Sequence, residues 1–230
     1  MRIHTGTSGY AYKEWKPLFY PPDLPGSAML RFYGERLGTV EVNNTFYRMP
    51  SKKLLQGWCD EVPPEFLFAV KATRRVTHFR RLRDVGSELD FLFGNLAALA
   101  GRLGAVLFQL PPNLHCDLPL LQDFLAQLAP HVRCAMEFRE PSWFDDAVYA
   151  ALRDSGVALC AMEEEDLEAQ VVPTAKFGYF RLRRGLYGAQ ELLAWVERIR
   201  AQPWEEVFVY FKHDTAAPNL AQEFVGLLGS

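Results

Sequence analysis

The stretch AVLFQL at residues 105–110 is an apolar run interrupted by one polar side chain, Gln109. Similar apolar runs end at Asn43, Lys71, Glu137 with Arg139, Glu163, Arg181 and Lys212, on average about 28 residues apart, which is the length of one strand and the helix that follows it. Polar residues at the carboxyl ends of buried parallel strands commonly face one shared pocket. The sequence therefore predicts a site at one end of a sheet.

Eight segments are predicted to be strands, and most are almost continuously apolar, as in a parallel sheet that is buried on both faces. They are residues 2–7, 39–43, 67–72, 105–110, 133–138, 157–162, 178–182 and 206–211. Helical patterns cover residues 28–37, 88–103, 118–128, 145–154, 189–201 and 217–228. This alternation favours an α/β fold, a compact (β/α)8 TIM barrel that forms a single domain over residues 1–230.

One connection is too short for a full helix. Only 17 residues separate Glu163 from Arg181; they begin with acidic residues and include Pro173. We therefore expect the helix between strands 6 and 7 to be reduced or missing. The alternative fold is an open doubly wound sheet, but no G-x-G-x-x-G motif follows the first strand.

Composition limits the classes of partner. The chain has 230 residues, of which 49% are hydrophobic, and a formal net charge of -3, so its total charge attracts neither nucleic acid nor anionic membrane. The start lacks a signal-peptide pattern, and no apolar run reaches the ~18 residues that span a bilayer. The four cysteines are far apart and read as structural thiols of a reducing compartment. We expect a cytoplasmic protein with no membrane partner and no cofactor.

Alternation along the strands predicts which polar side chains share a face. Glu41, Asn43 and Thr45 fall on one face, as do Glu137 and Arg139 on theirs. A buried carboxylate needs a cation or hydrogen-bond donors, and Lys71, Arg139 and Arg181 are the available cations. Two interpretations follow: Glu41 and Glu137 are general acids or bases with shifted pKa values, or they belong to an internal salt-bridge lattice that fills the barrel.

The segment KATRRVTHFRRLR at residues 71–83 is strongly basic and begins at a strand end. Clustered arginines suit phosphate or carboxylate groups, and the aromatic residues Phe79, Trp143 and Tyr187 would also suit single-stranded nucleic acid. A solvated basic loop is the simpler alternative. His4, His78 and His213 show no metal-ligand spacing, so we expect no metal. Ser8 with the His213-Asp214 pair is a weak candidate for nucleophilic catalysis.

Several motifs identify a family resemblance. GTSGY (6–10), WKPLFYP (15–21), VEVNNTFYRMP (40–50), FAVKATRRVTH (68–78), LFQLPPN (107–113) and MEFREPSWF (136–144) resemble the YecE-like family, a domain of unknown function with a TIM-barrel fold. The resemblance covers nearly the whole chain. It places Glu41, Asn43, Thr45, Tyr47, Lys71, His78, Gln109, Glu137, Arg139, Trp143 and Arg181 at motif positions, and it implies no particular reaction.

Three positions depart from the family pattern. Arg183-Arg184 stands near the place of a histidine-glycine pair, Lys212-His213 stands in place of paired asparagines, and Glu140 replaces a histidine. The first two changes add positive charge to one side of the predicted site. The resemblance therefore implies that ligand preference differs among members of the family.

We expect an enzyme that binds a small anionic substrate, phosphorylated or carboxylated, at the carboxyl ends of the strands; hydrolase, lyase or isomerase chemistry would all fit. The predicted catalytic residues are Glu41, Glu137 and Lys71. The predicted substrate-binding residues are Asn43, Thr45, Tyr47, His78, Gln109, Arg139, Trp143, Arg181 and Lys212. The alternatives are a nucleic-acid-binding or repair-associated module that uses loop 71–83, and a noncatalytic scaffold.

Overall fold

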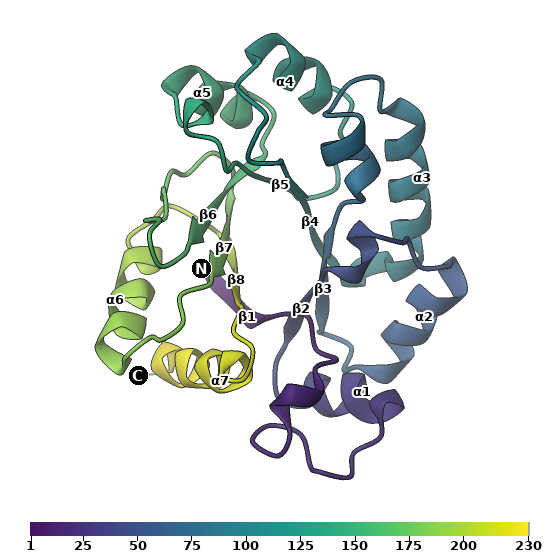
Figure 1. Ribbon diagram of the computed structural model, residues 1–230, viewed down its shortest axis with the longest axis vertical. Coiled ribbons are helices and arrows are strands. Elements are labelled where there is room, and N and C mark those ends of the chain that lie inside the picture. Colours follow the sequence, from purple (N-terminus) through teal and green to yellow (C-terminus); the bar gives the residue numbers. More distant parts are fainter. Residues whose placement is uncertain (230) are drawn as a thin grey trace.

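Eight parallel strands close into a barrel in the order β1 to β8. The computed structural model describes residues 1–229, and Figure 1 shows the ring of strands with helices around it. Each strand pairs in parallel with the next, and β8 pairs with β1. The predicted TIM barrel is confirmed. The strands are β1 (Arg2–Ser8), β2 (Thr39–Val42), β3 (Leu67–Lys71), β4 (Leu103–Gln109), β5 (Cys134–Glu137), β6 (Ala158–Glu163), β7 (Phe177–Leu182) and β8 (Glu206–Phe211).

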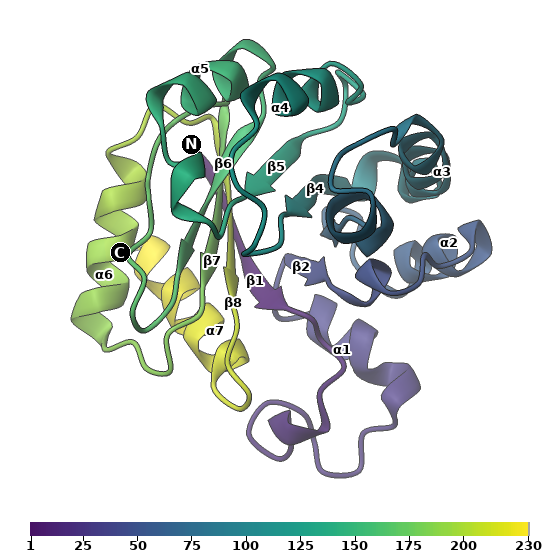
Figure 2. The same cartoon turned by 45° about the horizontal axis from the view of Figure 1, so that its top comes forward.

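Helices cover the outside of the barrel. They are α1 (Met29–Gly34), α2 (Lys52–Glu61), α3 (Gly86–Leu96), α4 (Leu118–Leu125), α5 (Asp146–Asp154), α6 (Ala189–Arg200) and α7 (Ala217–Leu228). The sequence patterns do not predict α2, because its residues are polar on average and only Leu55 is buried. Ser51 accepts a hydrogen bond from the Leu54 amide and caps the start of α2. Figure 2 shows α7 beside β1 and β8.

The pattern at residues 88–103 does not form one helix. α3 ends at Leu96, and a 3-10 segment, Ala97–Arg102, follows with Ala100 at a φ of 48°. Gly104 lies inside β4, where an added Cβ would come within 2.9 Å of the Phe208 ring. The glycine allows close packing across the barrel.

No helix lies between β6 and β7 in the described part of the chain, as the sequence predicts. The connection bonds to the barrel through Thr174, which is 4% exposed. Its hydroxyl donates to the Val157 carbonyl at 2.8 Å and accepts from the Leu159 amide at 2.7 Å. One side chain thus satisfies backbone groups at the start of β6 that a neighbouring helix does not cover.

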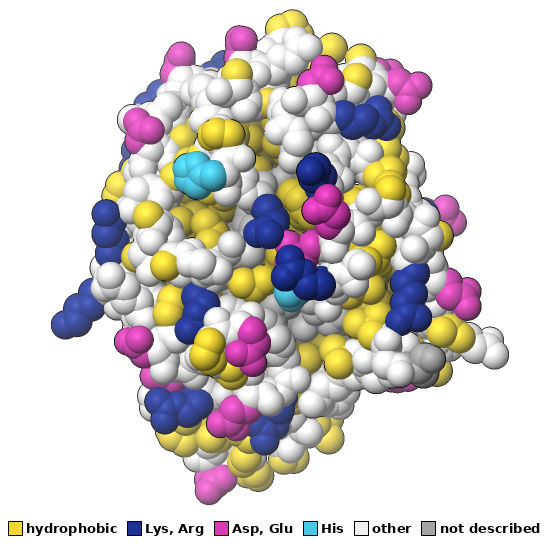
Figure 3. Space-filling view, turned by 180° about the vertical axis from the view of Figure 1, so that it is seen from behind, with side chains coloured by type: hydrophobic (Ala, Val, Ile, Leu, Met, Phe, Trp, Pro, Cys, Tyr) yellow, Lys and Arg dark blue, Asp and Glu magenta, His cyan; other side chains and the backbone are white. Residues whose placement is uncertain are grey.

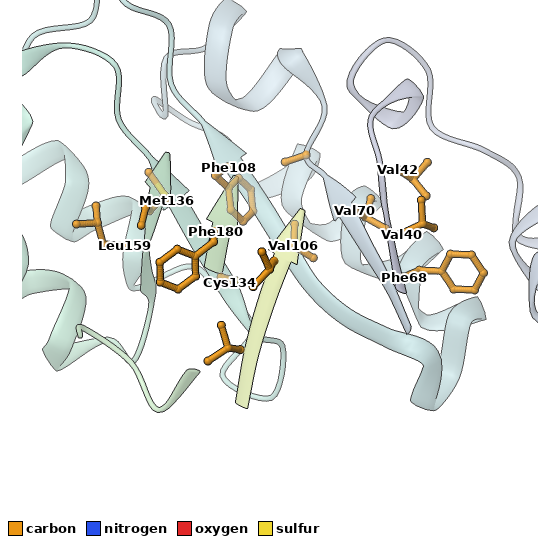
Figure 4. Packing of buried hydrophobic residues seen from close by; sticks show 14 of the residues in the cluster. Val40, Val42, Phe68, Val70, Val106, Phe108, Cys134, Met136, Leu159 and Phe180 are labelled. Carbon is orange, nitrogen blue, oxygen red and sulfur yellow. The ribbon is translucent and has the colours of Figure 1, made fainter. Parts of the chain in front are cut away.

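Strand side chains alternate between the barrel interior and the helix layer. Figure 4 shows outward-facing residues such as Val40, Phe68 and Phe108 in the hydrophobic layer. The interior holds small residues on β3 to β6, among them Ala69, Ala105, Ala135 and Ala158, opposite large ones on β7 and β8, Tyr179, Phe208 and Tyr210. This distribution of volume fills the interior below the carboxyl ends of the strands.

β1 and β2 approach each other closely at Gly6. A Cβ at this position would lie 1.9 Å from the Thr39 carbonyl oxygen. The hydroxyl of Tyr33 lies at the same place, where it accepts from the Thr7 amide and donates to the Thr39 carbonyl, both at 2.9 Å. Only glycine fits at this point of the barrel wall.

Charged residues also gather at the amino ends of the strands. Glu206 is 5% exposed and contacts His4 at 2.8 Å, Arg133 at 2.7 Å and Arg2 at 3.5 Å. Figure 3 shows basic, acidic and histidine side chains together near the middle of the face opposite that of Figure 1. In TIM barrels this end contributes to stability rather than to chemistry.

Two properties bear on the expected membrane and redox behaviour of the chain: its helices and its cysteines. Within residues 1–229, no helix combines the length and the apolar character needed to cross a bilayer. All four cysteines are free thiols, and two of them, Cys134 and Cys160, are buried.

Candidate functional site

The inward-facing polar side chains at the carboxyl ends of the strands form one hydrogen-bonded group, which we call the mouth cluster. Its members are Ser8 on β1, Glu41 on β2 with Asn43 just after it, Lys71 on β3, Gln109 on β4, Glu137 on β5 with Arg139 just after it, and Tyr179 and Arg181 on β7. Most of the predicted site residues therefore meet. They do so because they stand at inward positions at or just after the carboxyl ends of their strands.

Arg181 lies at the centre of the mouth cluster and is 3% exposed. Its Nη1 donates to Glu137 Oε2 at 2.5 Å, and its Nη2 donates to Glu41 Oε1 at 3.0 Å. Both carboxylates are fully buried. Arg181 is as deep as the glutamates and joins them into a buried Glu–Arg–Glu triad.

Glu41 has four further donors besides that contact. Arg181 Nε donates to its Oε1 at 3.2 Å, Ser8 Oγ at 2.8 Å and Asn43 Nδ2 at 3.1 Å, while the Tyr179 hydroxyl donates to Oε2 at 2.7 Å. Burial raises the pKa of the Glu41 carboxyl, but Arg181 and the three neutral donors outweigh burial, so its pKa lies below its ordinary value. Glu41 is an ionised and fully hydrogen-bonded group.

Glu137 connects the triad to the rim. Arg139 Nε donates to its Oε1 at 2.8 Å, and Arg139 is 21% exposed. Burial raises the pKa of Glu137, but Arg181 and Arg139 lower it by more, so this carboxyl is also held ionised. Arg139 also approaches Glu164 at 3.5 Å, and Glu164 pairs with Arg183 at 2.5 Å.

Lys71 differs from the arginines because no carboxylate in the described chain lies within ion-pair distance of its amino group. Its Nζ donates to Gln109 Oε1 at 2.8 Å and lies 4.4 Å from the centre of the Phe46 ring. Gln109 Oε1 also accepts from Arg181 Nη1 at 3.3 Å. Burial, and then the positive charge of Arg181, lower the pKa of Lys71 to about 8.

His78 lies on the rim next to Lys71. Its ring packs edge to face against Phe46, with centroids 4.8 Å apart, and its Nδ1 bonds the Thr77 hydroxyl at 2.8 Å. Burial, and then the charge of Lys71, lower its pKa. The imidazole is therefore neutral at pH 7.

Asn43 and Thr45 occupy the segment after β2, which ends at Val42 rather than at the predicted Asn43. Asn43 has a buried Oδ1 that accepts no hydrogen bond from any described residue. Thr45 turns away from the mouth, because Asn44–Phe46 is a 3-10 turn. Its hydroxyl bonds the carbonyls of Val42 at 2.9 Å and Lys71 at 2.7 Å, which fixes the turn against β3.

The remaining predicted ligand contacts lie apart from the mouth cluster. Trp143 is fully buried; it stacks on Phe138 at 4.8 Å and donates to the Leu114 carbonyl at 2.6 Å, so it packs in the core and does not reach the mouth. Tyr47 is 68% exposed and faces the loop after β3. Lys212 is exposed at the rim, where burial and then Arg183 lower its pKa.

Three cavities surround the mouth. The largest has about 810 Å³ and is lined by residues that include Tyr12, Asn43, Arg48, Trp58 and Phe91. Two others, of about 490 and 340 Å³, share Lys212, His213 and Asp214. Space for a ligand therefore lies beside the cluster on two sides.

The basic loop after β3 is partly neutralised. Arg80 pairs with Glu88 at 3.4 Å, Arg83 pairs with Asp117 at 2.9 Å, and Arg81 donates to Asn113 at 3.2 Å. Arg74 lies over the rings of Tyr47 at 5.4 Å and Phe79 at 5.1 Å. The loop is thus a mixture of packed ion pairs and one exposed group of aromatic and basic side chains.

Some members of the cluster were missed, and one strand-end acid lies elsewhere. Tyr179 stands two positions before Arg181 on the same strand, so alternation alone could have identified it; Ser8 was weighed only as a nucleophile.

Glu163 points outward and accepts from Tyr187 at 2.6 Å and Trp195 at 3.3 Å. Glu163 is the last residue of the run LCAME and has the opposite parity from Cys160 and Met162, which face the interior.

The histidines weighed as metal ligands do not meet. His4 lies at the amino end of the barrel, His78 and His213 on the opposite rim. In the part of the chain that the structure describes, no three His, Cys, Asp or Glu side chains are placed to hold a metal ion together.

Comparison with known proteins agrees with this architecture. A family model described as "Protein of unknown function DUF72" matches residues 4–230. The UPF0759 protein YunF of Bacillus subtilis (strain 168) is 27% identical over 156 residues, which are 64% of this chain and 54% of YunF. The match thus spans about half the length of that curated relative.

Two solved structures have the same fold. The DUF72 family protein TM1631 of Thermotoga maritima MSB8 is 24% identical, with a TM-score of 0.86 and complete coverage of both chains. The DUF72 family protein EF0366 of Enterococcus faecalis V583 is 19% identical, with a TM-score of 0.80 and coverage of 100% of this chain and 98% of the other. At these identities the likeness concerns the fold alone.

Proposed function

The chain belongs to the DUF72 family of proteins of unknown function, and within that family we propose that it is an enzyme acting on a small anionic substrate, phosphorylated or carboxylated, bound over the mouth cluster. The YecE-like family that the sequence motifs resemble is this same DUF72 family.

One observation carries the proposal: the mouth cluster has one more positive than negative charge. It holds three cations, Lys71, Arg139 and Arg181, against two carboxylates, Glu41 and Glu137. Lys71 and Lys212 have no described carboxylate within ion-pair distance. A bound anion would balance this excess, and a charge pair at 4 Å near a protein surface is worth roughly 4 kcal/mol.

The residues divide into a fixed group and a ligand-binding group. The Glu41–Arg181–Glu137 triad is buried and its hydrogen bonds are saturated, which supports a role in fixing the geometry and the charge. Arg139, Lys71 and Gln109 are partly exposed above it. We assign the anionic group of the substrate to Arg139 and Lys71, with Gln109 and Asn43 as orienting groups.

Lys71 is the group best suited to proton transfer. Its pKa of about 8 lies near a neutral working pH, where a general acid or base is most effective. Glu41 and Glu137 are also predicted catalytic residues. Because they are buried and ion-paired, they contribute to catalysis through their fixed negative charge rather than through proton transfer. Lys71 thus keeps its predicted catalytic role, whereas Glu41 and Glu137 act through their charge instead of as general acids or bases.

A thermal-shift titration tests the proposal. Sulfate and inorganic phosphate, followed by a panel of phosphorylated and carboxylated metabolites, should raise the melting temperature of the wild type, because a ligand that binds only the folded state stabilises it. The shift should disappear in Lys71→Met and in Arg139→Gln. Lys176→Met is the matched control, since Lys176 is 87% exposed and lies at the other end of the barrel.

The outcome is decisive in either direction. If the anions shift all variants equally, they act on the protein surface in general and the mouth is not their site. If no anion or metabolite shifts the wild type, the mouth cluster is the internal salt-bridge lattice of the alternative interpretation.

A second candidate function, binding of single-stranded nucleic acid, has one observation in its favour. Arg74 lies between two aromatic rings, Tyr47 at 68% and Phe79 at 67% exposure. Bases stack on such rings and on guanidinium planes. Oligonucleotide binding measured between 50 and 200 mM salt would fall steeply and would weaken in Arg74→Gln if this candidate is right. Binding that is absent at low salt would exclude it.

A further inference from the structure

We propose that Lys71 forms an imine with an aldehyde or ketone whose carboxylate or phosphate is held by Arg139 in the barrel mouth. The inference rests on the proposed anion site and adds to it a substrate class, an anionic carbonyl compound, and a chemical step. It is argued from the surroundings of the Lys71 amine.

The first argument is the set of contacts of the Lys71 amine. Its described hydrogen-bond partner is the neutral amide of Gln109, at 2.8 Å, and the Phe46 ring covers one side. An amine that is tied into a salt bridge is held protonated and cannot attack a carbonyl carbon. Arg139 and Arg181 each pair with a carboxylate, whereas the Lys71 amine has none within 4.0 Å in residues 1–229.

The second argument is the charge that faces the amine from the surrounding strands. Arg181 on β7 and Arg139 after β5 lower the pKa of Lys71, while Glu137 on β5 and Glu41 on β2 raise it, and burial is the largest effect. With a pKa of about 8, roughly 9% of Lys71 is neutral at pH 7, which is some 300-fold more than for a lysine of ordinary pKa. A neutral lysine amine is the nucleophile of imine chemistry.

Arg139 supplies a positive group at the same mouth, and its charge acts on the Lys71 amine. It is 21% exposed; its Nε donates to Glu137 and its Nη2 lies 3.5 Å from Glu164, which leaves its Nη1 to bind an anion. A carboxylate or phosphate on this guanidinium would bring an adjacent carbonyl toward Lys71. The neutral imidazole of His78, whose pKa Lys71 itself lowers, lies on the same rim and can accept and return a proton.

The step balances without a redox partner. The protonated amine of Lys71 loses one proton to a base, its nitrogen adds to the carbonyl carbon, and the carbonyl oxygen takes up a proton to give a carbinolamine. Loss of the hydroxyl group as water forms the protonated imine. In sum, one ammonium and one carbonyl give one iminium ion and one water, with no change of total charge.

Reductive trapping tests the inference. The full chain is incubated at pH 7 with glyoxylate and cyanoborohydride, whose hydride reduces an iminium ion to a stable secondary amine, and the modified residue is found by peptide mass spectrometry. We expect adduct formation at Lys71 at least about tenfold faster than at any of the other six lysines. Glycolaldehyde, which lacks the carboxylate, should label Lys71 far more slowly, and sulfate should slow the reaction with glyoxylate.

Two variants serve as controls. Lys71→Arg keeps the charge, removes the nucleophile and should give no fast adduct, whereas Lys176→Arg, a change at the other end of the barrel, should be labelled at the wild-type rate. Equal labelling of all lysines, or labelling that does not depend on the carboxylate, would overturn the inference. If sulfate or phosphate stabilises the wild type but no Lys71 adduct forms, the anion site stands and the imine does not; if neither occurs, both proposals fail.

Discussion

Replacing Arg181 with methionine should be the most destabilising single change in the barrel mouth that leaves the backbone unaltered. Methionine keeps much of the volume and removes the charge. Glu137 then loses a 2.5 Å contact, and Glu41 loses contacts of 3.0 and 3.2 Å. Both carboxylates remain fully buried.

The magnitude follows from what each carboxylate retains. Glu137 keeps Arg139, and Glu41 keeps only neutral donors, Ser8, Asn43 and Tyr179. Breaking a buried ion pair by removing one partner costs about 3–5 kcal/mol, because it leaves an uncompensated charge. We expect the free energy of unfolding at pH 7 to fall by roughly this amount, a large part of the ~5–15 kcal/mol that stabilises a typical domain.

The loss should also depend on pH. In the wild type the pKa values of Glu41 and Glu137 are lowered, so their contribution to stability is present above the unfolded pKa of about 4.5 and is lost as the pH falls through the folded values. Without Arg181, burial raises the pKa of Glu41 above its unfolded value. The variant then loses stability as the pH rises above the unfolded pKa of about 4.5, and its deficit widens until the pH passes the raised pKa of Glu41.

Urea unfolding followed by circular dichroism at several pH values measures this deficit. Arg139→Met is the matched control: this arginine is partly exposed and its loss should cost about 1 kcal/mol. The triple variant Glu41→Gln, Glu137→Gln, Arg181→Met should recover part of the deficit, since it leaves no buried charge from the triad. A deficit below 1 kcal/mol, or one that does not change with pH, would refute the reasoning.

Three further predictions follow from single positions. Lys71→Met should remove a pH dependence of wild-type unfolding. Between the folded pKa of Lys71, about 8, and its ordinary value of 10.5, only the unfolded state is protonated at this residue. The free energy of unfolding of the wild type therefore rises with pH in this range, by about 2 kcal/mol after allowing for partial exposure. Gly6→Ala should cost at least about 3 kcal/mol or prevent folding, because its Cβ overlaps the Thr39 carbonyl. Glu163→Gln should cost about 1–2 kcal/mol through Tyr187 and Trp195 while leaving the anion-induced thermal shift unchanged.

Each of these predictions has a clear contrary result. Parallel stability curves for wild type and Lys71→Met from pH 7.5 to 9.5 would mean that Lys71 is protonated like an exposed lysine. A Gly6→Ala protein of wild-type melting temperature would show that β1 and β2 can separate. Loss of the anion-induced shift in Glu163→Gln would place this outward-facing acid in the site.

The fold was largely predictable because a parallel barrel repeats one local pattern. The apolar runs located all eight strands to within two residues at each end, and β8 and α7 were predicted with their observed bounds. α2 was not predicted because its residues are polar on average and only Leu55 is buried. The 3-10 segment after α3 was not predicted because its apolar sequence continues the pattern of α3, while the backbone geometry changes at Ala100.

The site was predictable in membership but not in depth. Alternation along the strands brought Glu41, Lys71, Gln109, Glu137 and Arg181 together, because side-chain direction in a strand depends on parity alone. Parity does not say how far a long side chain reaches, and so it could not predict that Arg181 lies between the two glutamates. Trp143 lies in a 3-10 turn after its strand, where strand parity no longer applies.

The barrel wall is not equally strong around its circumference. β5 and β6 are paired over two positions, Ala135 with Ala158 and Met136 with Leu159, whereas β7 and β8 are paired over six. The missing helix leaves β6 and β7 covered by a loop on the same side. Hydrogen exchange should therefore be fastest, among the strands, at the amides of β6. Glu137 and Arg181 stand on opposite sides of this weak seam, so their ion pair links the two edges, and a ligand bound above them should slow exchange in β6, a strand that contributes no side chain to the mouth cluster.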